Sequence, residues 1–421
     1  MSTQPSTVKH PLRLALIGAG GIGSVHLNTL LAMEAKGQIR LMAVTDPAVE
    51  RLAERKTKLE ASGVRWYSDY RVMLDRESDL EAVIIATPIP VHFEMVSACI
   101  EQGLFINLEK PPVPLIEQLD KLDKLDRANR VAVCFQHICT EPVQQLKQWI
   151  GEGKLGELRT IRVTGSWPRS DKYYNRTSWA GKMVMGEEPV YDGPATNALA
   201  HVIHTVMYLA GDGPEAFASP ARIQAELYRI RPIESYDLIC MRGWFGSGLT
   251  FEVSLTHAGQ QNVPFRIEVR GTRDCARISQ DGNLLESSAG VPPNVANLTP
   301  EPDRFAPLHG DFVEFAQGIR SRPRTRLADT RGFLLATNGA LLSSKGIHDV
   351  DETFIRCHGE GDSTGYEVKG LPELMERGFR EGLLFSEMDA PWARSTSSVS
   401  VDDIRREGIR TLLNKPVLEF H

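Results

Sequence analysis

The first pattern in the sequence that could do chemistry is a glycine-rich run in which Gly18, Gly20 and Gly23 fit the spacing G-x-G-x-x-G. The first glycine of such a run makes a tight turn, the second lets a pyrophosphate approach the backbone, and the third lets a helix pack on a strand. Phosphates then lie at a helix N-terminus, where backbone N–H groups and the helix dipole favour anions. We therefore predict that Gly18, Gly20, Gly21, Ile22 and Gly23 bind a dinucleotide.

A carboxylate follows this run at the end of the next expected strand, Ile39–Thr45. Asp46 is placed to accept hydrogen bonds from a ribose diol and would repel a 2′-phosphate, and no arginine follows it directly. NAD is therefore the predicted cofactor, and NADP is the less favoured alternative. A glycine turn without a ligand is the competing interpretation, and the strand–turn–helix context makes it the weaker one.

Two further expected strands, Ala82–Ala86 and Leu104–Leu108, end in residues that could face the cofactor. Lysine is usually a solvated surface charge. One that directly follows a buried strand can instead exchange protons, because partial burial beside a cationic nicotinamide ring lowers its pKa. We predict Lys110 as a catalytic acid/base. The residues expected to line the cofactor site here are Thr87, His92, Glu109 and Lys110.

The elements that would position these residues alternate between strand and helix. Leu12–Ile17 is a nearly continuous apolar run, as expected for a strand buried on both faces of a parallel sheet. Pro47 can begin a helix that runs towards Glu60. Further strands are expected at 64–67, 82–86, 104–108 and 131–135, with helices near 70–74, 91–102 and 115–128. This order predicts a doubly wound α/β Rossmann domain over residues 10–140.

The pattern then changes to alternating strands, which predict an α+β domain over residues 141–350 with an open, mostly antiparallel sheet that has one polar face. The expected strands are 158–167, 222–230, 237–244, 249–255, 265–270 and 275–279. A mostly helical insert is expected at Pro168–Gly211, and further helices at His309–Arg320 and Ala328–Ser344. Residues 351–421 form a C-terminal extension of unknown role, in which Val401–Leu413 could be a short helix.

The ordered motifs resemble one family. The glycine turn, the Thr87–His92 segment, Glu109-Lys110-Pro111, Gly153–Glu157 and His309–Phe312 are similar to the glucose–fructose oxidoreductase / inositol dehydrogenase (Gfo/Idh/MocA) family over residues 12–346. The resemblance implies a Rossmann domain, a second domain whose open sheet often packs against other subunits, and tightly held NAD(P). It also implies oxidation or reduction of sugars and polyols.

The family carries a further catalytic segment that reads Asp-x-Gly-x-His, with another Asp three residues later. The matching stretch here keeps His201 but has Asn197, Leu199 and His204 where the family has Asp, Gly and Asp. On one helix, Asn197, His201, His204 and Tyr208 would share a polar face opposite an apolar one, as suits a helix that lines a cleft. We expect His201 to act in acid–base catalysis with Lys110, and Asn197 to orient a substrate hydroxyl. The alternative is a solvated helix face.

A segment upstream of this helix combines aromatic rings with Arg and Asn, which suits the wall of a sugar site. A surface loop stapled by buried aromatics is an equally weighted alternative. The residues predicted to bind substrate are Tyr174, Arg176, Trp179 and His204. Although His201 and His204 lie three residues apart, no third ligand stands at a useful spacing, so we predict no metal site.

Composition excludes several classes of protein. The 421 residues carry 48 Lys and Arg against 54 acidic residues, a formal charge of -6, which offers no basic surplus for nucleic acid or an anionic membrane. The six cysteines are scattered, so a disulfide scaffold is not expected. No apolar run approaches the length of a membrane-spanning helix, and Met1–Leu12 has no signal-peptide core. We expect a cytoplasmic homo-oligomer, a dimer or tetramer.

Three functions remain open. The first is an NAD-dependent dehydrogenase that acts on a secondary alcohol of a sugar, sugar acid or cyclitol. The second is an NAD-recycling enzyme that cleaves glycosides or epimerises, with His204 as an added base. The third is a non-catalytic regulator that senses NAD or a sugar, which the loss of the acid at position 197 weakly favours.

Overall fold

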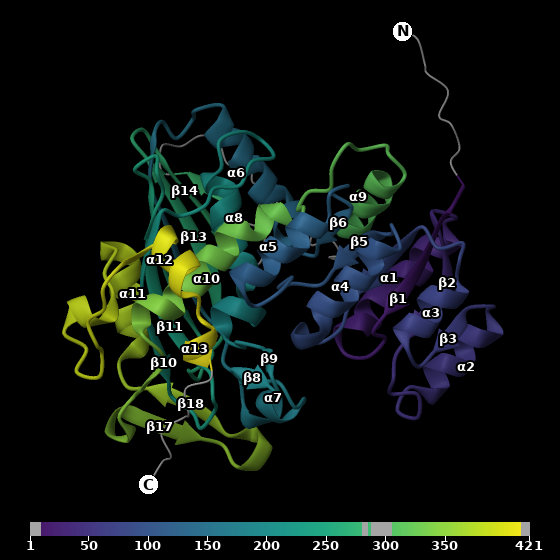
Figure 1. Cartoon of the computed structure of the whole chain (residues 1–421). Coiled ribbons are helices and arrows are strands. Elements are labelled where there is room, and N and C mark those ends of the chain that lie inside the picture. The colour runs from purple at the N-terminus through teal and green to yellow at the C-terminus, as the bar shows by residue number, and fades with distance from the viewer. Residues whose placement is uncertain (1–9, 280–284, 288–304, 414–421) are drawn as a thin grey trace. The chain divides into compact units, whose positions relative to one another are not determined.

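The computed structural model of the chain describes residues 10–279, 285–287 and 305–413 (Figure 1). The chain divides into two compact units. The first comprises residues 1–112, 121–136 and 301–327, and the second comprises 113–120, 137–300 and 328–421. Among the described residues, none of the helices combines the length and the apolar character that crossing a membrane requires.

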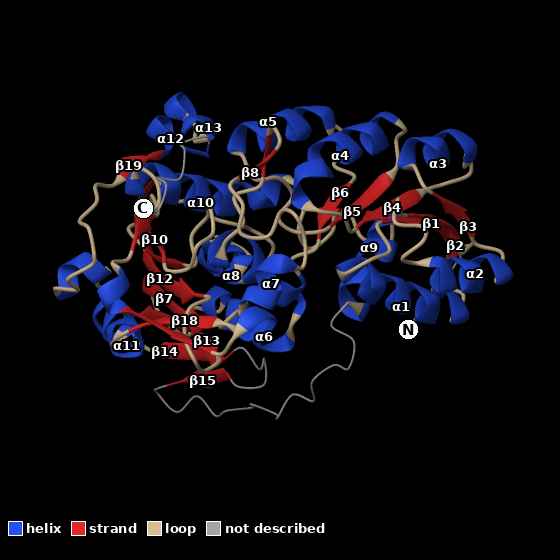
Figure 2. Cartoon of the chain, turned by 90° about the horizontal axis from the view of Figure 1, so that it is seen from below, coloured by secondary structure: helices blue, strands red, loops and turns tan. Residues whose placement is uncertain are grey.

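The first unit is built on a six-stranded parallel sheet in the order β3-β2-β1-β4-β5-β6 (Figure 2). The strands are β1 (Leu12–Ile17), β2 (Ile39–Thr45), β3 (Arg65–Tyr67), β4 (Ala82–Ile85), β5 (Phe105–Leu108) and β6 (Val131–Val133). The helices that alternate with them are α1 (Ile22–Ala35), α2 (Ala53–Ala61), α3 (Tyr70–Arg76), α4 (His92–Glu101) and α5 (Ile116–Leu125), of which the last begins within residues 113–120 of the second unit. The predicted doubly wound sheet is confirmed, and its order reverses between β1 and β4, where such sheets bind ligands.

The expected helix from Pro47 to Glu60 is shorter than predicted, because α2 begins only at Ala53. The Asp46 carboxylate accepts a hydrogen bond from the backbone N–H of Ala48, 2.8 Å away. A carboxylate that binds the backbone two residues on turns the chain. The residues before Ala53 therefore form turns.

One helix of the first unit comes from a distant part of the sequence. Phe312, Val313 and Phe315 of α9 (Ala306–Ala316) belong to the same buried cluster as the residues of β1, and the ring of Phe315 meets Phe105 edge to face at 5.3 Å. The sequence analysis assigned this helix to the second domain. Its apolar face instead completes the core of the first, so the expected boundary at residue 140 differs from the observed division.

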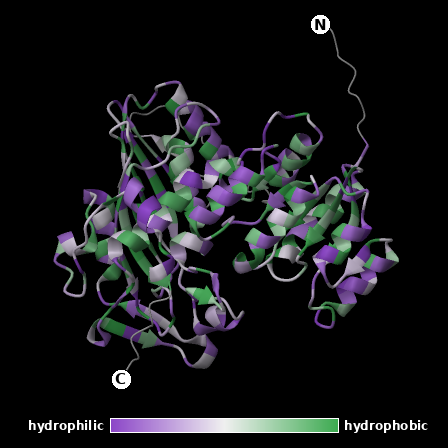
Figure 3. Cartoon of the chain, viewed as in Figure 1, coloured by the Kyte–Doolittle hydropathy of each residue, from purple (hydrophilic) through white to green (hydrophobic). Residues whose placement is uncertain are grey.

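The second unit contains a nine-stranded mixed sheet in the order β15-β14-β13-β7-β12-β11-β10-β16, with β19 also paired to β10. Only the β7–β12 and β10–β16 pairs are parallel, so the predicted open, mostly antiparallel sheet is confirmed. Hydrophobic residues concentrate along the inner strands (Figure 3). The strands are β7 (Leu158–Ser166), β10 (Arg222–Arg229), β11 (Leu238–Trp244), β12 (Thr250–Thr256), β13 (Val263–Gly271), β14 (Cys275–Ser279), β15 (Leu285–Ser287), β16 (His348–Asp349) and β19 (Val399–Ser400).

The remaining helices of this unit are α6 (Glu141–Gly151), α7 (Asp171–Asn175), α8 (Ala200–Ala210) and α10 (Arg331–Ser344). The insert that was expected to be mostly helical also holds a small hairpin, β8 (Val184–Met185) with β9 (Glu188–Pro189), and a π-helical turn at Pro194–Ala198. Alternate residues of β10 point to opposite faces of the sheet, and Ile223 packs against Gly339 of α10.

The opposite face of the sheet is polar, as predicted, and charges of alternating sign cross it. Arg242, Glu252, Arg162, Glu268 and Arg277 stand opposite one another on β11, β12, β7, β13 and β14. Such cross-strand pairs of opposite charge stabilise a sheet. This face is therefore built for polar partners.

The C-terminal extension packs on this sheet through both apolar contacts and ion pairs. It contains the hairpin β17 (Ile355–His358) and β18 (Gly365–Val368) and the helices α11 (Leu371–Glu381), α12 (Val401–Glu407) and α13 (Arg410–Leu413). Leu371, Met375 and Phe385 lie in a second buried cluster together with residues of β10 and β11. The single helix expected at Val401–Leu413 is split at Gly408, and α11 and the hairpin were not foreseen.

Candidate functional site

The glycine turn lies between β1 and α1, and packing within the protein requires two of its glycines. Gly18 has a φ of +92°, and a Cβ there would come within 2.5 Å of the carbonyl oxygen of Ala86. A Cβ at Gly23 would collide with the carbonyl oxygen of Gly18. These two glycines therefore let α1 and β4 pack closely around the turn.

Gly20 and Gly21 differ, because the protein itself leaves room for a side chain at both. A Cβ at Gly20 would meet the Arg51 guanidinium at 3.5 Å and the Asp46 carboxylate at 3.7 Å, which are ordinary contact distances. Gly21 stands directly before the first residue of α1, and a Cβ there would have none of the described atoms beyond its chain neighbours within 4 Å. The open backbone at a helix N-terminus fits the pyrophosphate of a dinucleotide.

Asp46 lies at the end of β2, where it holds the turn in place. Its Oδ2 accepts hydrogen bonds from the N–H groups of Ala19 (2.9 Å) and Gly20 (3.1 Å). A hollow of about 450 Å³ lies beside it, lined by Pro47, Ala48, Val49, Glu50 and Arg51. The hollow therefore lies next to the carboxylate that is predicted to bind the ribose.

Two arginines lie near Asp46 although neither follows it directly in sequence. Arg51 stands within contact distance of the position that a Cβ at Gly20 would take, and Arg55 of α2 donates a hydrogen bond to the carbonyl oxygen of Ala19. The sequence analysis missed both residues. The turns that precede α2 fold Arg51 back towards the glycine run.

Thr87 and His92 follow β4, and His92 is fully buried. Its Nε2 lies 2.9 Å from the carbonyl oxygen of Thr87, and its Nδ1 lies 3.0 Å from that of Pro111. Burial lowers the pKa of His92, and the two carbonyl acceptors oppose this. In the structure this side chain ties together the loops that follow β4 and β5, and its contact with a cofactor stays a prediction.

Glu109 and Lys110 follow β5 at the carboxyl edge of the sheet. Glu109 is buried, and its carboxylate accepts hydrogen bonds from the backbone N–H of Lys110 and from a ring nitrogen of His26, both at 2.9 Å. Burial raises the pKa of Glu109, but the bond to His26 and the charge of Lys110 lower it by more than burial raises it, so the net shift is downward. Glu109 is therefore a carboxylate that fixes the backbone beneath Lys110.

In the second unit, Asn197 lies in the π-helical turn and not on α8, because Leu199, with a φ of −107°, separates the two. The Asn197 side-chain N–H donates to Asp192 at 2.7 Å, and the other Asp192 oxygen accepts from the Gly181 N–H at 2.7 Å. Asp192 thus orients the amide. The sequence analysis missed it, although an acid directly before the Gly193-Pro194 turn was a usable signal.

The expected polar face along residues 197–208 does not form as predicted. His201 is half-buried in the first turn of α8. His204 is fully buried, its ring stacks on Phe217 at 4.8 Å, and burial lowers its pKa to about 3. Tyr208 is buried as well, and its hydroxyl donates to the carbonyl oxygen of Pro214 at 2.9 Å. His204 therefore packs in the protein interior and not on a cleft wall.

The predicted substrate-binding segment follows β7. The Tyr174 hydroxyl lies 3.1 Å from the Nδ1 of His257, and the Arg231 guanidinium lies 4.5 Å from the centre of the Tyr174 ring. Tyr174 thus acts as a half-buried staple. Arg176 is exposed and stacks over Tyr173 at 3.4 Å, and Trp179 lies 5.5 Å from the same guanidinium. Arg176 and Trp179 remain available to a ligand.

His257 was missed by the sequence analysis although it directly follows an expected strand. It is buried, and burial together with the nearby arginines holds its pKa well below the usual value. It is therefore a neutral hydrogen-bond partner that positions Tyr174.

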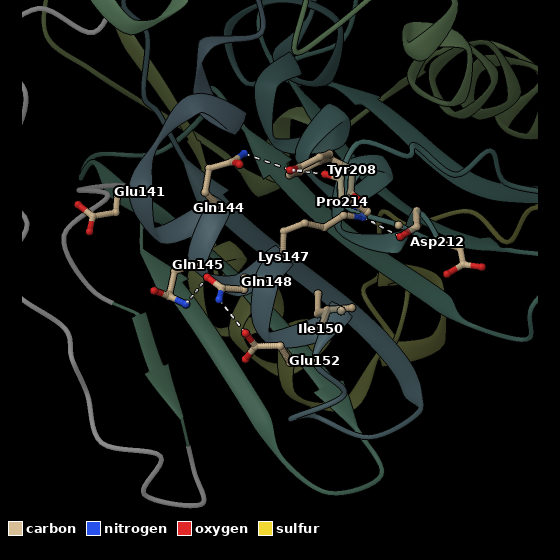
Figure 4. A pocket seen from close by; sticks show the side chains of 13 residues that line it. Glu141, Gln144, Gln145, Lys147, Gln148, Ile150, Glu152, Tyr208, Asp212 and Pro214 are labelled. Carbon is tan, nitrogen blue, oxygen red and sulfur yellow. Dashed lines mark hydrogen bonds between the residues drawn. The ribbon is translucent and has the colours of Figure 1, made fainter. Parts of the chain in front are cut away.

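A separate hollow of about 740 Å³ lies between α6 and the loop after α8 (Figure 4). Lys147 reaches across it and donates hydrogen bonds to the carbonyl oxygens of Tyr208 and of Gly211, the latter at 2.6 Å. Burial lowers the pKa of Lys147 to about 8. None of the predicted catalytic residues lines this hollow, and Lys147 acts there as a cap on the last carbonyls of α8.

A doubly wound sheet with this cradle at its switch point defines a dinucleotide-binding protein. Comparisons with known families place it more closely. Residues 12–137 match the model described as "Oxidoreductase family, NAD-binding Rossmann fold", and residues 143–277 match "GFO/IDH/MocA C-terminal domain". The chain belongs to the GFO/IDH/MocA oxidoreductase family, as the sequence motifs predicted, and the cofactor of that family's first domain is NAD.

Two curated relatives illustrate the similarity. Levoglucosan dehydrogenase of Pseudarthrobacter phenanthrenivorans is 29% identical over 53% of this chain and 56% of its own length. An inositol 2-dehydrogenase of Pseudomonas savastanoi is 26% identical over 48% of this chain and 55% of its own length. The chain thus spans about half the length of these relatives.

Solved structures share the fold. The WlbA dehydrogenase of Bordetella pertussis, in complex with NADH and UDP-GlcNAcA, superimposes with a TM-score of 0.70 at 20% identity, over 80% of this chain and 96% of that one. Levoglucosan dehydrogenase in complex with NADH superimposes with a TM-score of 0.67 at 22% identity, over 80% and 97%.

Proposed function

We propose that the protein is an NAD-dependent dehydrogenase that transfers a hydride between the nicotinamide and a secondary alcohol of a sugar, sugar acid or cyclitol. The observation that carries this proposal is the position of Lys110. It directly follows β5 at the carboxyl edge of the sheet, on a backbone held by the Glu109 carboxylate. The family and the names of the relatives support the class of reaction and of substrate.

In this mechanism Lys110 removes the hydroxyl proton during oxidation and returns it during reduction. Bound NAD supplies the hydride acceptor. A well-placed acid–base group contributes roughly 10²–10⁴ in rate. His201 assists as a second acid–base group or orients the hydroxyl, because it is half-buried at the start of α8.

Asn197 cannot exchange a proton, so its proposed role is to align the substrate. Its N–H is already directed at Asp192. The bond fixes the plane of the amide and so the orientation of the side chain that would face a hydroxyl. Arg176 and Trp179 are the proposed wall of the substrate site, together with the staple Tyr174.

The NAD-recycling alternative depended on His204 as an added base. A fully buried imidazole with a pKa of about 3 does not take up a proton at neutral pH, so nothing in the structure favours this alternative. The regulator alternative differs from the dehydrogenase in a single respect, since a regulator does not need the proton-exchanging group of Lys110.

Lys110→Ala therefore tests the proposal. We expect turnover of sugars or inositols, followed as NADH absorbance, to fall by about 10²–10⁴ while NAD still quenches protein fluorescence with little change in affinity. Lys110→Arg keeps the charge but does not give up its proton, and is expected to fail as well. Lys121→Ala, at an exposed lysine of α5, is the control. Unchanged turnover in Lys110→Ala would contradict the assigned role.

We also propose that the partners are a small sugar or polyol and further copies of the chain, as a cytoplasmic dimer or tetramer. Light scattering on the full chain tests the number of subunits. Much of the polar sheet face on which subunits were expected to pack is covered by the chain's own residues after 351.

A further inference from the structure

We propose that His26 and His309 are positioning residues: together with Asn107 they form a buried hydrogen-bonded chain of fixed direction that keeps Glu109 in place beneath Lys110. The inference rests on the proposed function, because it concerns the orientation of the proposed catalytic lysine. All residues of this hydrogen-bonded chain lie in the first unit.

The hydrogen-bonded chain links three elements, α1, α9 and β5, with the residues that follow β5 and β6. His26 of α1 contacts Glu109 through Nε2 at 2.9 Å and His309 of α9 through Nδ1 at 3.0 Å. The Nδ1 of His309 lies 3.2 Å from the side-chain nitrogen of Asn107, on β5, and the Cys134 thiol lies 3.2 Å from the Asn107 oxygen. His26, His309 and Asn107 are each 0% exposed. Water therefore does not compete for these bonds.

With the Asn107 amide oriented as in the structure, its oxygen towards the Cys134 thiol, the donors and acceptors fit one direction. The Asn107 N–H donates to Nδ1 of His309, so the proton of that neutral ring is on Nε2. His309 Nε2–H then donates to Nδ1 of His26, which in turn carries its proton on Nε2 and donates it to Glu109. The Cys134 S–H donates to the Asn107 oxygen and fixes the orientation of the amide. Every bond in the series is thereby satisfied with both rings neutral.

The opposite direction requires a different charge state. With the amide of Asn107 turned over, both rings would carry their protons on Nδ1, and Glu109 would have to donate a proton to His26. Burial holds the pKa of His309 well below its usual value, and the net pKa shift of Glu109 is downward. At neutral pH the chain therefore ends on a carboxylate, which is the form that accepts from the Lys110 N–H.

The titratable groups that face the chain come from every side of it. Lys110 places its charge near Glu109, the buried His92 lies close enough to interact with the same carboxylate, and Cys134 closes the far end. The ring of Phe305 packs against both histidines, with its centre 4.5 Å from His26 and 6.1 Å from His309. The chain is thus enclosed by one cation, one neutral ring, one thiol and one apolar ring.

The same place could be taken for a metal site, since ligand atoms of His26, Glu109 and Cys134 lie within 4.8 Å of one another. A metal would need the lone pair of His26 Nε2, which in the direction derived above carries a proton directed at Glu109. The direct contact between these two side chains leaves the ligands paired with each other. The geometry therefore favours a hydrogen-bonded chain.

The experiment combines His309→Phe with a packing control, Phe305→Leu. In His309→Phe the His26 ring loses the donor that fixes its tautomer, so its bond to Glu109 weakens and the pKa of Glu109 rises. Because activity needs the carboxylate, the acid limb of the kcat/KM profile should move to higher pH, with about a tenfold loss of kcat and little change in the KM for NAD. Phe305→Leu should leave the profile unchanged. A wild-type profile in His309→Phe would overturn the positioning role.

A second measurement does not depend on turnover. Nitrogen NMR of ¹⁵N-histidine in the full chain is expected to show His26 and His309 as Nε2–H tautomers, and His309 is not expected to titrate between about pH 6 and about pH 8. A proton on Nδ1, or titration of His309 in this range, would overturn the derived direction. If no sugar or polyol is turned over, the proposed function fails while the tautomers still decide the inference.

Discussion

Gly20 and Gly23 belong to the same short turn but lack a side chain for different reasons. Gly23 lacks a side chain because the backbone of Gly18 leaves no space for one. Gly20 lacks one although the protein has room for it, so the space is kept for something the chain does not itself contain. At this scale, the difference separates a requirement of folding from a requirement of binding.

Alanine at each position tests that separation. Gly20→Ala should leave the free energy of unfolding within about 1 kcal/mol of the original, because its Cβ makes ordinary contacts, and should weaken NAD binding more than tenfold. Gly23→Ala should lower the free energy of unfolding by about 2 kcal/mol or more, because backbone must move. Urea unfolding and fluorescence titration with NAD measure the two effects. Equal losses of stability would contradict the distinction.

Carbonyl groups at the end of α8 accept hydrogen bonds from Lys147 of α6. This contact makes the stability of the protein depend on pH. Burial lowers the folded-state pKa of Lys147 from 10.5 to about 8, whereas its carbonyl acceptors favour the charged form. With the pKa of Lys147 lowered in this way, the unfolded chain binds more protons than the folded protein between about pH 8 and about pH 10.5. Stability from this group then rises with pH across that window.

Lys147→Met should remove this rise. We would measure the free energy of unfolding with urea at several values from about pH 7.5 to about pH 10.5. The free energy of the original protein should increase relative to that of Lys147→Met as the pH increases. Lys172→Met, at an exposed lysine of α7, is the control and should follow the original. A constant difference would show that the carbonyl groups keep the ammonium charged.

Elements were predictable from the sequence where local pattern decides them. The apolar runs at Leu12–Ile17 and Ala82–Ala86 located β1 and β4 closely, because a strand buried on both faces is apolar along almost its whole length. The apolar face of α9 predicted a helix but not which sheet it would cover. His204 was misplaced because the π-helical turn and the contact with Phe217 are tertiary features. Leu371, Met375 and Phe379 lie on one face of α11, and this periodicity was overlooked.

At the scale of the whole molecule, the polar sheet face and the C-terminal extension form one unit of stability. Glu226 of β10 is fully buried and accepts hydrogen bonds from the Ser386 hydroxyl at 2.6 Å and the Tyr228 hydroxyl at 2.8 Å. Burial raises the pKa of Glu226. Arg242 pairs with Glu387 and Arg266 with Glu376 at the edges of the same contact. The extension is therefore anchored by a buried polar group and surrounded by ion pairs.

Ser386→Ala should reveal how strongly that anchor holds. Removal of the hydroxyl leaves one oxygen of a buried carboxylate short of its donor, which costs about 1–3 kcal/mol in the free energy of unfolding. Ser395→Ala, at an exposed serine of the same extension, should cost less than about 0.5 kcal/mol. Chemical denaturation of both variants provides the comparison. Equal values would mean that the extension does not depend on Glu226.

The return of α9 to the first sheet also has a consequence for how the protein is made. When the ribosome has synthesised residue 140, every strand of the first sheet has been made, but His309, Phe312 and Phe315 have not. Until residue 327 emerges, the nascent sheet carries an uncovered apolar face and a Glu109–His26 pair without its donor. Domains usually fold in order of synthesis. Here the first unit must wait for most of the second to be translated, so the two halves of the protein mature together.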